Sequence, residues 1–270
     1  MQIKYFRGTW GMELPSLEAN LRLIREAGFD GVEMVVPADP KERGALRDLV
    51  NELDLDLILQ VLTVGKTPEE HTRSFEEQYC QAVELQPRMV NSHTGKDYFS
   101  TAENAAIIRR AAELANEMGV PVVHEIHRGR ATFSTLAAMA LLDAAPEMRL
   151  TADFSHWCCV HESMLGDQPD RIERAIRHSQ HIHARVGHPE GPQVSDPRAP
   201  EWQGAVETHL GWWQRIVDHH KQQGTQVLTI TPEFGPPGYM PTLPFTRQPV
   251  TSLWDVNLYM RDLLKERIRL

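Results

Sequence analysis

The chain is poor in cysteine and lacks the hydrophobic segments that carry proteins into or through membranes. Its three cysteines are Cys80, Cys158 and Cys159, and neither their number nor their spacing resembles a disulfide framework. The first fourteen residues, MQIKYFRGTWGMEL, contain no apolar run of the signal-peptide kind. No stretch approaches the ~20 consecutive apolar residues of a membrane-spanning helix. These absences predict a cytoplasmic protein that does not bind membranes.

Positive charge is also scarce. The formal net charge is -9 and the pI is about 5.8, which disfavours nucleic acid or an anionic membrane as a partner. With 41% hydrophobic and 24% charged residues, the composition is that of an ordinary globular protein. A chain of 270 residues can bury a large core, and α/β barrels of this length fold as one domain.

Strand-like and helix-like segments alternate along the whole chain. Ser16 is placed to cap one helix, and Gly28 and Gly119 are placed to end two of them. The apolar patterns predict strands at residues 3–9, 29–36, 54–62, 88–92, 120–126, 150–154, 181–188 and 226–233. They predict helices at residues 16–27, 40–53, 67–85, 102–118, 133–144, 169–179, 201–223 and 252–269.

Eight such strand-helix pairs predict a (β/α)8 TIM barrel that occupies residues 1–270 as a single domain. A doubly wound open sheet is the main rival. It would carry a GxGxxG turn after its first strand, and Gly8-Thr-Trp-Gly11 does not match that motif. Two long, proline-rich loops, 187–200 and 234–250, follow the seventh and eighth strands. In a barrel they lie on the face that holds active sites.

Polar residues stand at the C-terminal ends of four successive strands. If the barrel is correct, Glu125, Asp153, His183 and Glu233 converge there. Three carboxylates and one imidazole suit one divalent ion with open coordination positions, and without an ion such carboxylates would repel one another. Manganese fits this ligand set best, and zinc, cobalt or magnesium remain alternatives. Taken singly, a strand-end Asp such as Asp153 could equally be a salt-bridge or capping residue.

Further polar residues near the strand ends are candidates for contacts with a substrate. Glu33 could instead be structural, and Arg185 could bind a carboxylate, a phosphate or a pair of hydroxyls. His124 and His181 are expected to be hydrogen-bonded packing residues. Several histidines of the helices, His71, His219 and His220, are expected to lie on helix surfaces. The substrate-binding candidates are Glu33, His93, His127, Arg128, Arg185 and His188.

These residues resemble the xylose-isomerase-like TIM-barrel superfamily of sugar isomerases, ketose 3-epimerases and sugar phosphate isomerase/epimerase proteins. The resemblance spans essentially the whole chain. It is carried by Gly28-Phe-Asp-Gly-Val-Glu33, by Glu125 after Val122-Val-His, by Asp153-Phe-Ser-His156, by His181-Ile-His183 and by Thr231-Pro-Glu233.

The resemblance implies that Glu125, Asp153, His183 and Glu233 bind one divalent metal ion and that His156 contacts the substrate. It also implies that Glu125 and Glu233 are the catalytic acid/base pair. A carbon-bound proton beside a carbonyl is weakly acidic, and a metal that holds the substrate oxygens stabilises the enediolate left when the proton departs. Two carboxylates on opposite faces of the substrate could remove and return that proton. The expected function is therefore a metal-dependent sugar isomerase or epimerase.

The sequence departs from the epimerases after the seventh strand. The epimerases have a Gly-Glu pair there and an arginine beyond it, whereas this chain has His183-Ala-Arg-Val-Gly-His188. With Arg128 as a second guanidinium, the substrate could be more anionic than a plain ketose. It could also be a keto-sugar derivative or a glycoside, for which enolisation leads to elimination. A metal-dependent lyase or hydrolase is therefore an alternative.

A third reading is the apurinic-site endonuclease of the same superfamily, which uses three metal ions. That reading requires an Asp-x-His pair after the seventh strand, where this chain has Asp196-Pro-Arg198, and it would favour a histidine at the position of Gln60. His93 is available, but the acidic balance disfavours a nuclease. The expected partner is a small sugar or sugar derivative rather than nucleic acid, and a homodimer or homotetramer is possible.

Overall fold

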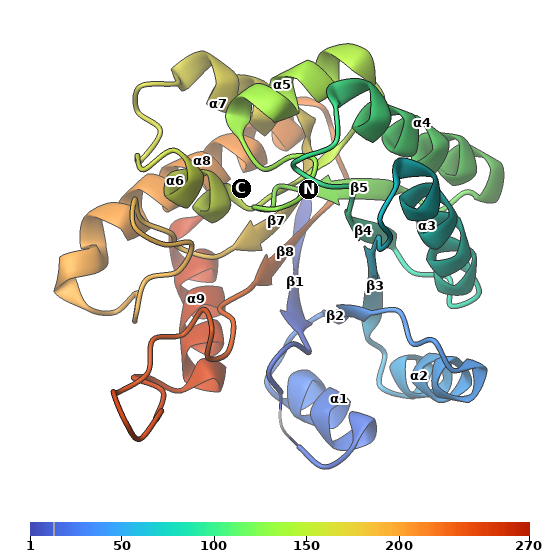
Figure 1. Cartoon of the computed structure of the whole chain (residues 1–270). Coiled ribbons are helices and arrows are strands. Elements are labelled where there is room, and N and C mark those ends of the chain that lie inside the picture. Colours follow the sequence, from blue (N-terminus) through green and yellow to red (C-terminus); the bar gives the residue numbers. More distant parts are fainter. Residues whose placement is uncertain (13) are drawn as a thin grey trace.

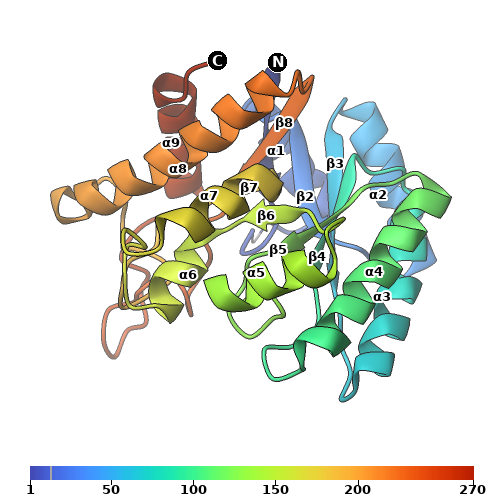
Figure 2. The same cartoon turned by 90° about the horizontal axis from the view of Figure 1, so that it is seen from above.

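The eight strands close into one parallel barrel. The structure is a computed structural model that describes residues 1–12 and 14–270. Each strand pairs in parallel with the next along the chain, and the eighth returns to the first, so the predicted TIM barrel is confirmed (Figures 1 and 2). The strands are β1 Gln2–Gly8, β2 Gly31–Val35, β3 Asp56–Leu62, β4 Met89–His93, β5 Val122–Glu125, β6 Leu150–Ala152, β7 Ser179–Ala184 and β8 Val227–Pro232.

Helices surround the barrel, as Figure 2 shows from above. Among the described helices, none combines the length and the apolar character that crossing a bilayer requires. The helices are α1 Leu17–Glu26, α2 Pro40–Glu52, α3 Pro68–Val83, α4 Thr101–Met118, α5 Thr135–Ala144, α6 Phe154–Val160, α7 Pro169–His178, α8 Gln203–Gln222 and α9 Leu253–Arg267, with a short 3-10 helix, η1, at Pro200–Trp202.

Local sequence signals set several helix ends. The Ser16 hydroxyl accepts a hydrogen bond from the Ala19 amide and caps α1, as the sequence predicts. Gly28 and Gly119 follow α1 and α4 with φ of 80° and 78°, a left-handed conformation that favours glycine. The predicted glycine stops are therefore confirmed.

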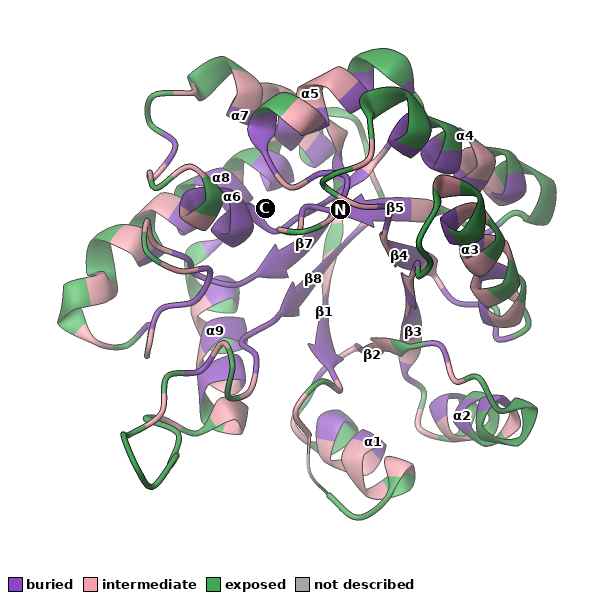
Figure 3. Cartoon of the chain, in the orientation of Figure 1, coloured by how far each residue is buried: buried purple, intermediate pink, exposed green. Residues whose placement is uncertain are grey.

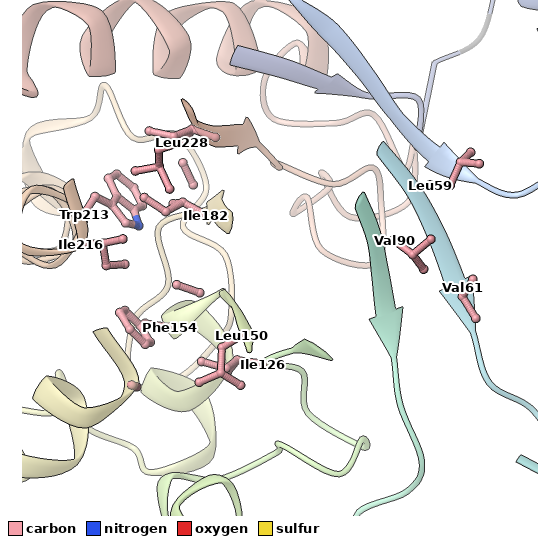
Figure 4. Close-up of a cluster of buried hydrophobic side chains, with 14 of the residues drawn as sticks. Leu59, Val61, Val90, Ile126, Leu150, Phe154, Ile182, Trp213, Ile216 and Leu228 are labelled. Atoms are coloured by element: carbon pink, nitrogen blue, oxygen red, sulfur yellow. The ribbon is translucent and has the colours of Figure 1, made fainter. Parts of the chain in front are cut away.

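The main hydrophobic core lies between the outer face of the barrel and the surrounding helices. In Figure 4, Trp213 and Ile216 of α8 face Ile182 of β7 and Leu228 of β8, and all four are fully buried. Figure 3 shows the same division, because the strands are mostly buried and the outer faces of the helices are exposed. Burial of a large aliphatic side chain contributes about 1.5–3 kcal/mol, so this layer fixes the strands whose ends carry polar groups.

The largest departure from the predicted elements is at the sixth and seventh strands. The predicted strand 150–154 ends at Ala152, because Asp153 caps α6 by accepting a hydrogen bond from the Ser155 amide at 3.2 Å. The predicted strand 181–188 begins earlier and ends at Ala184. The sequence gives no helical prediction for α6, since seven residues are too few to display a clear period.

Two histidines predicted to lie on helix surfaces are buried. His71 is 0% exposed and hydrogen-bonds Thr63, and His220 is 3% exposed and donates from Nε2 to the Ser179 carbonyl. Both tie a helix to the end of a strand, a contact that the helical period alone cannot reveal. His124 matches its prediction, since it is buried and hydrogen-bonds Thr94 at 2.7 Å.

We expect His209 of α8 to make the folded protein less stable as the pH is lowered. Its Nδ1 donates to the Ala205 carbonyl at 2.9 Å, and its Nε2 accepts from the Gly187 amide at 3.3 Å, so the folded ring is neutral. Burial lowers the pKa of His209 to about 4, against about 6.5 for an unfolded chain. Between these values only the unfolded state takes up the proton, so roughly 3 kcal/mol of unfolding free energy is lost as pH falls from 6.5 to 4.

Urea unfolding of the wild type and of His209→Gln at pH 7 and pH 4.5 checks this prediction. The glutamine carbonyl can still accept from Gly187 but does not titrate, so the variant should lose less stability on acidification. His219→Gln, on the same helix, is the control. Equal acid sensitivity of His209→Gln and the wild type would contradict the prediction.

Candidate metal centre

Four side chains from adjacent strand ends meet at the C-terminal mouth of the barrel. Glu125 ends β5, Asp153 follows β6, His183 lies in β7 and Glu233 follows β8. One ligand atom from each of the four lies within 4.8 Å of all the others, and all four residues are buried. The predicted cluster is therefore assembled by the fold.

Two atoms of this cluster have no hydrogen-bond partner in the described chain. His183 Nδ1 and Glu233 Oε2 are buried, lie 2.8 Å apart and make no hydrogen bond, although Arg185 Nη2 approaches Glu233 Oε2 to 3.3 Å. A buried polar atom without a partner is costly, and a cation that accepts a lone pair from each atom would remove that cost. Together with two further carboxylates, they form a donor set that suits a divalent ion.

Glu33 of β2 lies beneath the cluster and holds His183 in place. Its Oε1 accepts from His183 Nε2 at 2.9 Å, and its Oε2 accepts from the Thr231 hydroxyl at 2.6 Å. Gln60, Asn91 and His181 also lie within hydrogen-bonding distance of this carboxylate. With the proton of His183 on Nε2, Nδ1 is free to act as a ligand, which is how carboxylates commonly orient metal-binding histidines.

The charges of the cluster depend on one another. Burial alone would raise the pKa of Glu33, but His183 and His181 outweigh burial and hold it well below its usual range. Burial would also raise the pKa of Glu125, and there His93 and His183 lower it. Both carboxylates are therefore ionised. Burial favours neutral His183, but Glu233, Glu33 and Glu125 raise its pKa well above the usual value. The site thus attracts positive charge, and a bound cation would take the place of the proton that these carboxylates favour on His183 Nδ1.

Arg185 lies over the outer part of the cluster. It is 1% exposed, its Nη2 contacts Asp153 Oδ2, and the same nitrogen lies 3.3 Å from Glu233 Oε2. It also donates to His156 Nε2 at 2.9 Å. Burial raises the pKa of Asp153 to about 6 although Arg185 opposes the change. Arg185, predicted to bind substrate, pairs with the carboxylates of the cluster and also lines the cavity above them, so its substrate contact stays a prediction.

A cavity of about 460 Å³ opens above these groups. Tyr239, from the long loop before α9 (Figure 1), forms one side, with its ring 4.7 Å from the Arg185 guanidinium and edge-on to Trp10 at 5.1 Å. Arg130 lines another part and donates to the Thr63 carbonyl. Polar groups at the base and aromatic rings at the side suit a small polar molecule.

Four of the seven predicted substrate-binding residues line the cavity, and three do not. Glu33, His93, His127 and Arg185 line the cavity. His156 is buried beside Arg185, outside the residues that line it. Arg128 and His188 do not line the cavity either: the Arg128 guanidinium lies 5.1 Å from the ring centre of Tyr239, and the ring of His188 packs against Trp202 at 4.7 Å.

Some cavity residues were not assigned from the sequence. Trp10, Arg130 and Tyr239 lie in loops, where no periodic pattern indicates direction. Asn91 of β4, which does not line the cavity, was not assigned either, and its amide donates to Glu125 Oε2 at 2.9 Å. A count of inward-facing polar residues on β4 could have identified it.

The described residues contain two other groups with metal-ligand geometry. One is Glu33, His181 and His183, and the other is His93, Glu125 and His127. Both share a residue with the four-ligand cluster, and the hydrogen bonds of Glu33 are already made within the protein. Asp196 is not part of any such group, since its carboxylate binds the Arg198 side chain at 2.7 Å near the surface. The extra acidic ligand of the three-metal nuclease is therefore not brought to this site.

A closed parallel barrel with a carboxylate-histidine cluster at its C-terminal mouth defines a TIM-barrel protein with a candidate metal centre. The model of the xylose isomerase-like TIM barrel family matches residues 21–235, and the chain belongs to that family. No curated protein matches it in sequence.

Solved structures with this fold include proteins named as an epimerase-like protein, a dehydratase and an endonuclease. A D-tagatose 3-epimerase-like protein has a TM-score of 0.67 and 14% identity, over 98% of this chain and 96% of its own. A probable 3-DHS dehydratase involved in petrobactin synthesis from Bacillus anthracis has a TM-score of 0.62 and 15% identity, over 98% and 99%. Endonuclease IV from Thermus thermophilus has a TM-score of 0.60 and 13% identity, over 97% and 99%. At these identities the likeness shows the fold alone.

Proposed function

We propose that this protein is a divalent-metal-dependent isomerase or epimerase of a sugar or sugar derivative. The observation that carries the proposal is the pair His183 Nδ1 and Glu233 Oε2, buried without hydrogen bonds among three carboxylates. The family and the epimerase-like structural neighbour support a sugar as the substrate. Manganese is the ion we propose, with zinc, cobalt and magnesium as alternatives.

The residues divide the chemistry among them. Glu125, Asp153, His183 and Glu233 would hold the ion, which when bound supplies positive charge that stabilises the oxygens of a deprotonated carbonyl compound. Glu125 and Glu233 come from non-adjacent strands, and both line the cavity. One removes the proton beside the substrate carbonyl and the other returns a proton to the opposite face. Arg185 holds the carboxylate of Asp153 in position.

Removal of the same proton leads to elimination when a leaving group stands on the next carbon. A lyase that acts on a keto-sugar or glycoside is therefore the second candidate function. The structural match to a probable dehydratase supports this candidate. The two outcomes differ in product. An isomerase or epimerase returns a saturated sugar with one solvent hydrogen, whereas a lyase releases an unsaturated ketone that absorbs ultraviolet light.

We predict that protein purified without chelator and supplied with Mn²⁺ contains one divalent ion per chain. His183→Ala removes the unpaired nitrogen and should lose the ion. His124→Gln is the matched control, because His124 is a buried histidine that binds Thr94 outside the cluster. Elemental analysis gives the stoichiometry, and deuterium uptake from heavy water into ketoses then reports proton transfer.

Each outcome of the metal analysis has a consequence. Two or three ions per chain would favour the nuclease reading and a test on abasic DNA. No ion, even after divalent metals are supplied, would contradict the metal centre. Retention of the ion by His183→Ala would contradict the ligand assignment.

A further inference from the structure

A second cavity, of about 380 Å³, lies between α1, α9 and the loops that follow β1 and β8. In Figure 1 strand β1 ends beside these loops. Arg7 lines this cavity, and we call it the Arg7 cavity. It shares no lining residue with the cavity above the metal centre. Its walls are largely apolar and include Met12, Leu23, Pro236, Met240, Leu253 and Trp254.

Arg7 is a buried cation without an acidic partner among the described residues. It is 2% exposed, and no carboxylate of the described chain lies within ion-pair distance of it. Its Nη1 donates to the Gly8 carbonyl, its Nε has no partner, and its guanidinium lies 5.7 Å from the ring centre of Trp254. Burial lowers the pKa of Arg7 to about 10 and the Glu233 carboxylate, beyond ion-pair distance, opposes the change, so the group is charged at neutral pH. A buried charge without a direct ion pair is costly unless something anionic joins it.

The same cavity contains an unpaired acceptor. The Asn20 amide nitrogen donates to the Ser16 carbonyl at 2.9 Å, whereas its Oδ1 is buried without a partner. Asn20 lines the cavity together with Arg7. A ligand that satisfies both residues must therefore present an acceptor to Arg7 and a hydroxyl or amino donor to Asn20.

The wall also includes the start of α9. Ser252 caps this 15-residue helix by accepting from the Asp255 amide, and Leu253 and Trp254 are its first two residues. Their amides have no acceptor within the helix, and a helix N-terminus favours negative charge. Asp255 is exposed and interacts electrostatically with Arg198 rather than with Arg7. The helix end and the buried guanidinium thus favour an anion on the same wall.

We propose that the Arg7 cavity binds a small organic acid that is separate from the sugar substrate. Its carboxylate would be held by Arg7 and the N-terminus of α9, its apolar body by the walls, and a donor group by Asn20. An inorganic anion would fill little of this volume and could form few hydrogen bonds with the apolar walls. The Arg7 cavity shares no lining residue with the cavity above the metal centre, although the Glu233 carboxylate attracts Arg7 from beyond ion-pair distance.

Benzoate is the test ligand, and benzyl alcohol is its neutral counterpart. The signal is the indole N–H of Trp254 in a ¹H–¹⁵N spectrum, assigned with Trp254→Phe. We expect benzoate to move this signal saturably and benzyl alcohol to bind about 10-fold more weakly or worse, because a hydrogen bond to a charged group is lost. Equal binding of the two compounds, or no saturable shift with benzoate, would overturn the proposal.

Variants locate the site. Arg7→Met keeps most of the side-chain bulk and should weaken benzoate binding about 10-fold or more. Arg43→Met is the matched control, since Arg43 is a buried arginine of α2 that pairs with Glu84. Leu253→Trp fills the cavity but keeps the charge of Arg7, and it should also block benzoate binding. This variant provides the test if Arg7→Met does not fold. Unchanged affinity in both cavity variants would refute the assignment.

Two further variants separate this proposal from its rivals. Glu13 stands between the wall residues Met12 and Leu14 in sequence, so Glu13→Gln tests an internal carboxylate as the occupant. Equal binding by Glu13→Gln and the wild type is expected, and binding by the variant alone would overturn the proposal. His183→Ala should bind benzoate normally, so a failure of the proposed metal centre would leave this result intact. Loss of benzoate binding in His183→Ala would contradict an independent site.

Discussion

Glu233→Gln is expected to reduce formation of the epimerised or isomerised product by about 10²–10⁴-fold while most of the bound metal is retained. The glutamine keeps an oxygen that can coordinate an ion but cannot accept a proton at neutral pH. Glu125→Gln should act in the same way from the other side of the cavity. Product formation and solvent deuterium uptake are measured separately, and elemental analysis measures the metal in the same samples.

The comparison of the two glutamate variants is informative in itself. If one carboxylate removes the proton and the other returns it, each variant blocks a different half of the reaction. Exchange of the substrate proton without formation of epimer can then survive in one variant only. Glu190→Gln, an exposed carboxylate in the loop after β7, is the control. Full exchange in both Glu125→Gln and Glu233→Gln would contradict their role as acid and base.

Glu33→Gln is expected to weaken the binding of Mn²⁺ by about 10–100-fold without removing a ligand atom. The Glu33 carboxylate accepts from His183, Asn91 and Thr231. A neutral amide would place an NH₂ group against one of these donors, and His183 could then carry its proton on Nδ1, the atom that faces Glu233. Isothermal titration with Mn²⁺ gives the affinity, and ¹⁵N shifts of the His183 ring report which nitrogen is protonated.

Gln60→Ala is the matched control for this variant. It removes one hydrogen bond to Glu33, at 3.1 Å, and leaves the carboxylate in place. We expect a much smaller loss of affinity from it, with the tautomer of His183 unchanged. Wild-type affinity in Glu33→Gln, or lost affinity with an unchanged tautomer, would contradict the positioning role.

The fold could be predicted because the barrel follows directly from periodic patterns. Alternation along β5 and β8 assigns Glu125 and Glu233 to the inner face once the strands are parallel. His183 follows in the same way from β7. These positions depend on strand direction and on the two-residue period of a strand, and both can be inferred from the sequence. The four-residue cluster could therefore be predicted.

The remainder depended on contacts that no local pattern displays. Trp10 and Tyr239 come from separate loops and meet only in the folded chain, 5.1 Å apart. His71 lies on a helix whose neighbours determine its burial, and those neighbours are not adjacent in sequence. The role of Glu33 likewise depends on five partners from four other strands, and a single strand-end glutamate gives no indication of them.

Asp153 belongs to two structures at once. One of its oxygens caps α6, and the same carboxylate is a member of the four-residue cluster. Binding of a metal ion to the cluster and unfolding of the first turn of α6 therefore involve the same carboxylate. The free energies of the two events are linked. The exchange rates of the amide hydrogens in Phe154–Val160 should therefore report how much of the protein has an ion in the cluster, without a substrate or an activity assay.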